Sequence, residues 1–266
     1  MSAQTEAVKV RCIIEERVAV ITLADPASRN AFTDRLLTEL HQALDIAMAS
    51  REVGAVLIRA EGPDFSAGGN LREMVSLPTR PLAQIEAEGR PIAELFKRLG
   101  CSPKPVIAAV HGSALGGGCG LACAATIALA ADDARFGCPE LRLGMFPFLL
   151  MPVLRRAVGD RNALSLALTG RVTGAAEAAA LGLVSQVVAA DALQSEALAL
   201  ARRIGSSSPD ALRLGLQAFH ETTDMDLYAS MDRNLALRST CCTSPNVGEG
   251  IRAFLEKRPA RWNFDL

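Results

Sequence analysis

Two glycine-rich turns, each between an apolar run and a helix-like stretch, constrain the fold of this 266-residue chain more than any other feature. The second turn follows an apolar run at residues 106–110 and contains three consecutive glycines, Gly116 to Gly118. A short helix-like stretch at 119–124 and another apolar run at 126–130 come directly after it. Short apolar strands that alternate with helices are typical of an α/β core. We therefore expect an α/β fold.

The remaining pattern divides the chain into a mixed core and a helical end. Runs rich in β-branched residues predict strands at residues 8–14, 18–23, 53–59, 106–110, 126–130 and 184–188. Helical periodicity predicts helices at 91–99, at 119–124 and after Thr33, an N-cap, to about 49, with a mostly helical chain from 148 onward. A mobile polar segment with Pro78, Pro81 and Gly89 is expected before residue 91. We expect a core at 1–204 and a helical lobe at 205–266 that forms an oligomer contact.

Composition excludes several classes of function. The net charge of −1 gives no basic stripe for nucleic acid, and the 4% aromatic content predicts a core of Ala, Leu and Val. The seven cysteines have neither zinc-site spacing nor a disulfide framework, which favours free thiols in a reducing compartment and no metal. Residues 1–7 are polar, and the apolar stretch at 122–131 is too short to span a bilayer. We expect a soluble cytoplasmic protein with no nucleic-acid or membrane partner.

The two turns suit the binding of an oxygen anion. The first spans residues 65–71 and the second spans 111–119. Glycine lets the backbone approach a ligand closely, and N–H groups at the start of a helix point outward without partners. Either turn alone is an ordinary loop before a helix, and neither has the G-x-G-x-x-G spacing of a dinucleotide site.

Together with other blocks in the same order, the turns resemble the crotonase (enoyl-CoA hydratase/isomerase) superfamily. The matching blocks lie at residues 29–31, 65–71, 111–119, 131–140, 170–184 and 249–258, so the likeness covers nearly the whole chain. The resemblance implies a fold of repeated ββα turns in a superhelix, with a helical C-terminal lobe. It implies an acyl-CoA substrate, no cofactor beyond the coenzyme A of that substrate, and a homotrimer or a hexamer built as a dimer of trimers.

The resemblance also assigns residues to the site. It implies that the N–H groups of Gly69 and Gly117 form an oxyanion hole for the thioester oxygen, a role that requires no side chain. Removing a proton beside the thioester puts negative charge on that oxygen, and one such donor is worth about 3 kcal/mol. The expected substrate-binding residues are Asn30, Ala31, Ala67, Gly68, Asn70, Leu71, Gly116, Gly120, Phe146, Phe148, Phe254 and Lys257. The last two belong to the tail, which is expected to cover CoA across a subunit contact.

The carboxylates decide the reaction. Hydratases of this superfamily place one glutamate just after the second turn and another in a later Pro-Glu pair; here those positions hold Gly120 and Glu140. A single acid/base can move a proton between two carbons, which resembles the superfamily's Δ3,Δ2-enoyl-CoA isomerases. The bulky stretch at 148–151 also resembles that branch. Apolar neighbours such as Phe146 and Phe148 are expected to raise the pKa of Glu140. Isomerisation is favoured, and hydration stays open.

Two other functions remain open. The chain can be read as a low-turnover paralogue that binds acyl-CoA, because it lacks one carboxylate, or as a CoA thioesterase. A hydrolase triad of Ser66, His111 and Asp132 is disfavoured, since no G-x-S-x-G elbow exists.

Other polar and sulfur-containing residues near the blocks are assigned structural roles. Without the resemblance, Glu140 would be read as a helix cap or an ion-pair partner of Arg142. His111 is expected to be structural, and Asp64 and Glu73 are expected to be solvated charges. The following residues are expected to be inert thiols or surface and packing histidines: Cys119, Cys138, His41 and His220.

Overall fold

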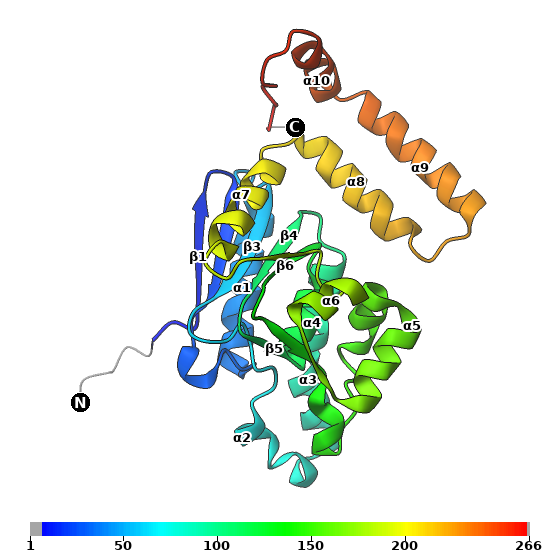
Figure 1. Ribbon diagram of the computed structural model, residues 1–266. Helices are drawn as coiled ribbons and strands as arrows, with labels where there is room; N and C mark the ends of the chain where they lie inside the picture. Colours follow the sequence, from blue (N-terminus) through cyan, green and yellow to red (C-terminus); the bar gives the residue numbers. More distant parts are fainter. Residues whose placement is uncertain (1–6, 265–266) are drawn as a thin grey trace.

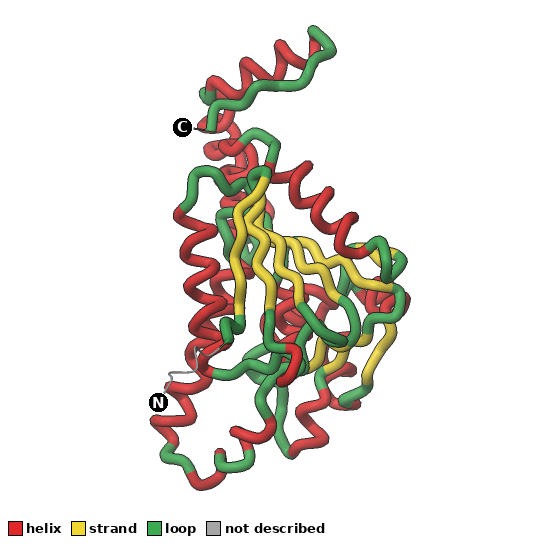
Figure 2. The backbone as a smooth tube through the Cα atoms, turned by 90° about the vertical axis from the view of Figure 1, so that its left-hand side faces the viewer, coloured by secondary structure: helices red, strands yellow, loops and turns green. Residues whose placement is uncertain are grey.

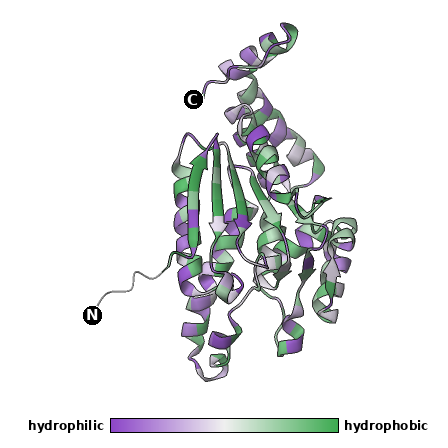
Figure 3. Cartoon of the chain, turned by 60° about the vertical axis from the view of Figure 1, so that its left-hand side comes forward, coloured by the Kyte–Doolittle hydropathy of each residue, from purple (hydrophilic) through white to green (hydrophobic). Residues whose placement is uncertain are grey.

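The computed structural model describes residues 7–264, and a six-stranded sheet forms its centre (Figure 1). The strand order is β1-β2-β3-β4-β6-β9, and every neighbouring pair is parallel except the β1–β2 hairpin. The strands are β1 (Val10–Glu15), β2 (Val18–Leu23), β3 (Ala55–Ala60), β4 (Val106–Val110), β6 (Ile127–Ala131) and β9 (Gln186–Val188). Their apolar side chains explain why the larger sheet is hydrophobic along most of its length (Figure 3).

Helices cover both faces of this sheet (Figure 2). α1 (Asp34–Ala49) packs against β1 and β2, and α7 (Leu193–Gly205) packs against β3 and β4. Thr33 caps α1 by accepting a hydrogen bond from the Leu36 N–H, as the sequence predicts. Both faces of β2 and β4 are therefore buried, which accounts for their uninterrupted apolar sequences.

A second, three-stranded sheet lies beside the second glycine-rich turn. It consists of β5 (Ser113–Leu115), β7 (Arg135–Gly137) and β8 (Val172–Gly174), with β7 between the other two. The parallel pairing of β5 with β7 brings the residues before Gly116 next to the residues before Glu140. This small sheet therefore aligns two segments to which the sequence assigns chemistry.

The helices around the small sheet are α2 (Leu71–Met74), α3 (Leu82–Gly100), α4 (Gly117–Ala124), α5 (Met151–Thr169) and α6 (Ala175–Leu181). α3 differs from the sequence expectation, because it begins at Leu82 rather than near residue 91 and contains Pro91 in its interior. Most of the segment expected to be a mobile loop is therefore helix. Proline removes one backbone hydrogen bond, and burial of Leu95, Phe96 and Leu99 on the core side offsets that loss.

Three helices form a lobe beyond one end of the larger sheet (Figure 1). They are α8 (Pro209–Thr222), α9 (Leu227–Cys242) and α10 (Pro245–Leu255), and α8 packs against α9. The lobe exposes large apolar side chains, among them Tyr228 at 84% and Phe254 at 83%. The division into domains at residues 204 and 205 stays a prediction. Within residues 7–264, no helix is both long and apolar enough to cross a membrane.

Candidate active site

The first glycine-rich segment runs alongside β5. The Phe65 N–H donates to the His111 carbonyl oxygen, and the Ser66 N–H donates to that of Ser113, both at 3.0 Å. In return, the Leu115 N–H donates to the Ser66 carbonyl oxygen at 3.0 Å. These bonds fix the register between two segments that are about 50 residues apart in the chain, and they bring both turns to one place.

Gly68 makes the closest approach between the two turns. Its φ is +81°, and a β-carbon built on it would lie 2.8 Å from the backbone nitrogen of Gly117 and closer still to the carbonyl oxygen of Leu115. A side chain at this position would therefore force the two turns apart. Gly116 has φ 50° and ψ −118°, a conformation that strongly favours glycine and that starts α4 in this direction.

The two predicted donors both lie at this junction. Within residues 7–264, neither the Gly69 N–H nor the Gly117 N–H donates a hydrogen bond to another group of the protein. Gly117 is the first residue of α4, where N–H groups have no partner in the helix, and the helix dipole favours an anion. Both glycines line a cavity of about 490 Å³.

The walls of this cavity are largely apolar, with one carboxylate in the lining that the described residues provide. That carboxylate is Glu140, on the helical turn Pro139–Leu143 that follows β7. Its Oε1 lies 2.9 Å from a β-carbon built on Gly116, so it stands beside the turn that carries Gly117. A second cavity of about 770 Å³, between α2 and α3, shares Phe32, Gly69 and other residues with the first.

Glu140 has no ion-pair partner in the described part of the chain, although Arg29 and Arg142 line the same cavity. Its Oε2 is buried and has no hydrogen-bond partner among the described residues, and no ion pair with Arg142 forms there. Burial raises the pKa of the Glu140 carboxyl above its ordinary value. The alternative role of Glu140 as an ion-pair partner of Arg142 is therefore wrong.

Apolar side chains fill the space next to Gly120, the position at which the superfamily's hydratases carry a second glutamate. A β-carbon built on Gly120 would lie 2.5 Å from Cζ of Phe96 and 3.0 Å from Cβ of Leu150. Phe96 on α3 and Leu150 just before α5 are both buried and line the cavity, whereas Gly120 lies behind them. The sequence offered no signal for Phe96, because the contact joins two helices that periodicity treats separately.

The other predicted binding residues separate into three groups. The following line the cavity: Ala67, Leu71, Gly116, Phe146 and Phe148. Asn70 caps α2 and lines the neighbouring cavity. Ala31 is buried and lines neither cavity. Phe254 lies in α10 and Lys257 lies just after it, at the opposite end of the fold from α2 (Figure 1). Within one chain, the tail does not reach the site.

Asn30 has a structural side chain. Its Nδ2 donates to the carbonyl oxygens of Glu61 and Asp64 at 2.9 Å each, and its Oδ1 accepts from the Asp25 N–H. Its own carbonyl oxygen accepts from the Ser66 hydroxyl at 2.8 Å. Asn30 therefore ties the loop before α1 to the first glycine-rich turn, and its amide does not line the cavity.

Asp64 corrects one sequence expectation. It is 7% exposed rather than solvated, and it accepts hydrogen bonds from Arg29 Nε at 2.6 Å and the Ser113 N–H at 2.9 Å. The bond from Arg29 is the main cause that lowers the pKa of Asp64 to about 2. This carboxylate joins three segments around the site, which a local sequence pattern cannot indicate.

The geometry opposes a hydrolase triad. Nε2 of His111 lies 2.9 Å from the Gly62 carbonyl oxygen, and the Ser66 hydroxyl donates to the Asn30 carbonyl oxygen. The two side chains are therefore not hydrogen-bonded to each other, as a catalytic serine and histidine would be. The expectation that His111 is structural fits this contact. Cys119 and Cys138 are buried, and the pKa of Cys138 is raised by its hydrogen bond with Cys119 and by burial, which fits inert thiols.

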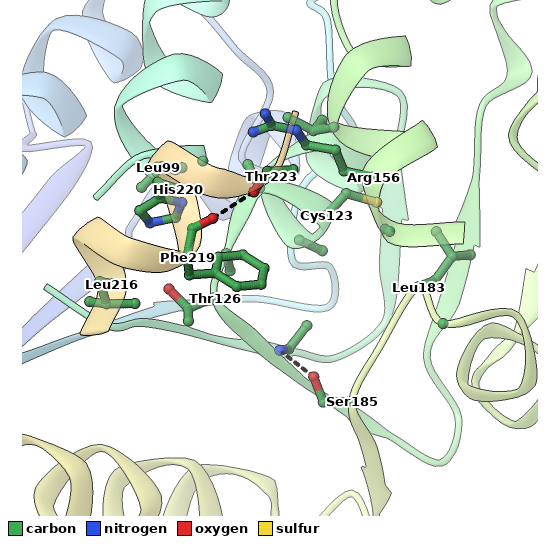
Figure 4. Close-up of a pocket in the computed structure, with 18 residues that line it drawn as sticks. Leu99, Cys123, Thr126, Arg156, Leu183, Ser185, Leu216, Phe219, His220 and Thr223 are labelled. Carbon is green, nitrogen blue, oxygen red and sulfur yellow. Dashed lines mark hydrogen bonds between the residues drawn. The ribbon is translucent and has the colours of Figure 1, made fainter. Parts of the chain in front are cut away.

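A separate cavity of about 560 Å³ lies between α4, α5 and α8 (Figure 4). Phe219 and His220 of α8 line it, together with Cys123 and Arg156. Its lining from the described residues includes no carboxylate and neither Gly69 nor Gly117. The chemistry expected from the sequence therefore belongs to the cavity around Glu140.

Comparisons with known proteins identify the family of this chain. A sequence model of the enoyl-CoA hydratase/isomerase family matches residues 13–264. A putative enoyl-CoA hydratase of Thermus thermophilus is 36% identical and covers 92% of this chain and 97% of its own length. The 2,3-dehydroadipyl-CoA hydratase of Escherichia coli is 36% identical, with coverages of 92% and 94%. The crystal structure of an enoyl-CoA hydratase from Mycobacterium smegmatis superposes with a TM-score of 0.90 at 30% identity, covering 96% of this chain and 98% of that one. The chain belongs to the enoyl-CoA hydratase/isomerase family and has the crotonase fold.

Proposed function

We propose that this acyl-CoA enzyme isomerises the double bond of an enoyl-CoA, with Glu140 as its only acid/base. The proposal is carried by the one carboxylate that the described residues place in this largely apolar cavity, with Oε2 unpartnered, near two backbone N–H groups that donate no hydrogen bond within residues 7–264. Glu140 forms no ion pair in the described part of the chain, and burial raises its pKa, which suits a group that accepts a proton and gives it back.

The reaction follows from this geometry in two proton transfers. The Glu140 carboxylate takes a proton from C2 of a 3-enoyl thioester, and the negative charge moves to the thioester oxygen. The N–H groups of Gly69 and Gly117 donate to that oxygen, and each is worth about 3 kcal/mol to the barrier. The same carboxyl then protonates C4, which leaves the double bond between C2 and C3. The shuttle consumes no water, and coenzyme A enters only as part of the substrate.

Hydration of a 2-enoyl-CoA is the second candidate, because the relatives reported above carry hydratase names. It needs a water held for attack on C3, which two carboxylates would share. Here Phe96 and Leu150 line the cavity and occupy the space next to residue 120, where a second carboxylate would stand. That contrast supports isomerisation over hydration.

The absorbance of the conjugated thioester tests the proposal. Purified protein with 3-enoyl-CoA should increase this absorbance, and Glu140→Gln should abolish the increase while CoA-ester binding persists. Glu196→Gln is the matched control, because this exposed carboxylate lies on α7 and lines neither the Glu140 cavity nor the neighbouring one. Unchanged turnover in Glu140→Gln would refute the shuttle. Binding without any change in either enoyl-CoA would favour the low-turnover paralogue, and thiol release would indicate a thioesterase.

We also propose that copies of the chain assemble into a trimer, or a dimer of trimers, through the helical lobe. Tyr228, Phe254 and Leu255 are each more than 70% exposed on this lobe, an unusual exposure for large apolar side chains. An assembled neighbour could supply Phe254 and Lys257 to the CoA of the adjacent copy, which would explain why they lie far from the cavity of their own chain.

A further inference from the structure

We infer that Phe96 is the residue that determines reaction specificity at this site, because its ring occupies the volume that a second carboxylate would need. The inference rests on the proposed function, since it concerns the choice between proton transfer and water addition at the Glu140 site. Phe96 comes from α3, and Gly120, the position it covers, comes from α4.

The steric part of the argument depends on three distances. A β-carbon at residue 120 would lie 2.5 Å from Cζ and 3.0 Å from Cε2 of Phe96, and 3.0 Å from Cβ of Leu150. A glutamate would add four further heavy atoms beyond that β-carbon, directed into the same space. Phe96 is 4% exposed, so its ring has little free volume into which to turn. A side chain at residue 120 and the Phe96 ring therefore exclude each other.

The chemical part concerns water. A water molecule inside a protein needs two to four polar partners, and a carbon surface supplies none. The wall that Phe96, Leu150 and Ile92 form is carbon, whereas Glu140 stands with Oε2 unbonded. A water placed on the Phe96 side would lose its hydrogen bonds, so the ring both replaces the second carboxylate and disfavours the nucleophile that this carboxylate would hold.

The two residues should consequently act as a size-matched pair. Gly120→Ala should lower the melting temperature in the wild-type background and should lower it much less when combined with Phe96→Leu. Strict additivity of the two changes would overturn the steric argument. This measurement needs no substrate, so its outcome is independent of whether the wild-type protein isomerises 3-enoyl-CoA.

The catalytic test replaces the ring by a carboxylate. The double variant Gly120→Glu/Phe96→Ala should hydrate 2-enoyl-CoA at least tenfold faster than the wild type, relative to its isomerisation of 3-enoyl-CoA. Gly120→Glu alone should not, because the ring still occupies the space. Leu95→Ala is the control: Leu95 is a fully buried residue of α3 outside the cavity lining, and its loss should leave the ratio of the two activities unchanged.

Two results would overturn the inference. One is a single Gly120→Glu variant that melts at the wild-type temperature and hydrates as fast as the double variant. The other is a folded double variant whose activity ratio equals that of the wild type. If the double variant does not fold, the melting-temperature coupling decides the matter. Failure of wild-type isomerisation would count against the proposed function alone.

Discussion

Gly68→Ala is the substitution that most directly tests how the two glycine-rich turns make one site. Gly68 has φ +81°, and an L-residue in the left-handed region costs about 1–2 kcal/mol. The added β-carbon would lie 2.8 Å from the Gly117 nitrogen and closer still to the Leu115 carbonyl oxygen, and real β-carbons essentially never lie within 3.0 Å of such atoms. Both obstructing groups are backbone, so neither can rotate away.

The cost can be set against the stability of the whole fold. Overpacking adds about 1–3 kcal/mol to the backbone strain, which gives about 2–5 kcal/mol in total. Domains of this kind unfold with about 5–15 kcal/mol, so the variant should fold with reduced stability. Relief of the clash moves the Gly117 N–H away from the thioester oxygen. A misplacement near 1 Å costs about 100-fold in rate, so kcat should fall by about that factor.

Urea unfolding and steady-state isomerisation of 3-enoyl-CoA measure the two effects. Gly215→Ala is the matched control, since it adds the same methyl group in helix α8 with no atom within 4 Å of the new β-carbon. It should stabilise the protein by about 0.5–1 kcal/mol without changing kcat. If Gly68→Ala keeps both its unfolding free energy and its kcat within error of the wild type, the two turns do not depend on this contact and the reasoning is wrong.

Three further predictions concern charge and assembly. Burial raises the pKa of Glu140, so the contribution of this group to stability is full below pH 4.5 and is lost as the pH rises through the pKa of the folded state. Glu140→Gln should therefore raise the melting temperature at pH 7. The catalytic rate of the wild type should rise with pH through the same ionisation. The pKa of Asp64 is shifted in the opposite direction, so its stabilisation is present above pH 3.8 and is lost as the pH falls toward about 2. Asp64→Asn should lower the free energy of unfolding in urea by about 1–2 kcal/mol at pH 7, a figure discounted because Arg29 is exposed, and by much less at pH 2. Phe254→Asp should reduce the assembled mass in light scattering, and an unchanged mass would remove the lobe's apolar face from the proposed contact.

Local patterns were sufficient to predict much of the fold. The Thr33 cap, the β2 strand and the β4 strand were predicted correctly, because each depends on neighbouring residues in the chain. The start of α3 was wrong by nine residues, since Pro91 is a strong local signal that tertiary packing overrides. The three-residue strands of the small sheet were missed because they are too short to show alternation.

The candidate site shows the same division between local and distant information. The glycine-rich turns were visible in the sequence, and the resemblance to the crotonase superfamily implied the roles of Gly69, Gly117 and Glu140. The residues that fix their geometry come from elsewhere: Asp64 joins Ser113, and Phe96 covers the α4 helix. Such contacts join segments tens of residues apart, and no periodicity or spacing in one sequence records them.

The isolation of Glu140 and the absence of a side chain at residue 120 have one physical origin. α3 places Phe96 against α4, which removes the space for a side chain at residue 120 and adds an apolar wall to the cavity that Glu140 lines. An added cation would stabilise the charged form and prevent return of the proton, and an added carboxylate would bring in water. Burying a carboxylate without either partner lowers the stability of the folded state, so a functional advantage is needed to explain why the residue is there. In the proposed shuttle, Glu140 is a base in one step and an acid in the next, and it gains from this environment because burial raises its pKa.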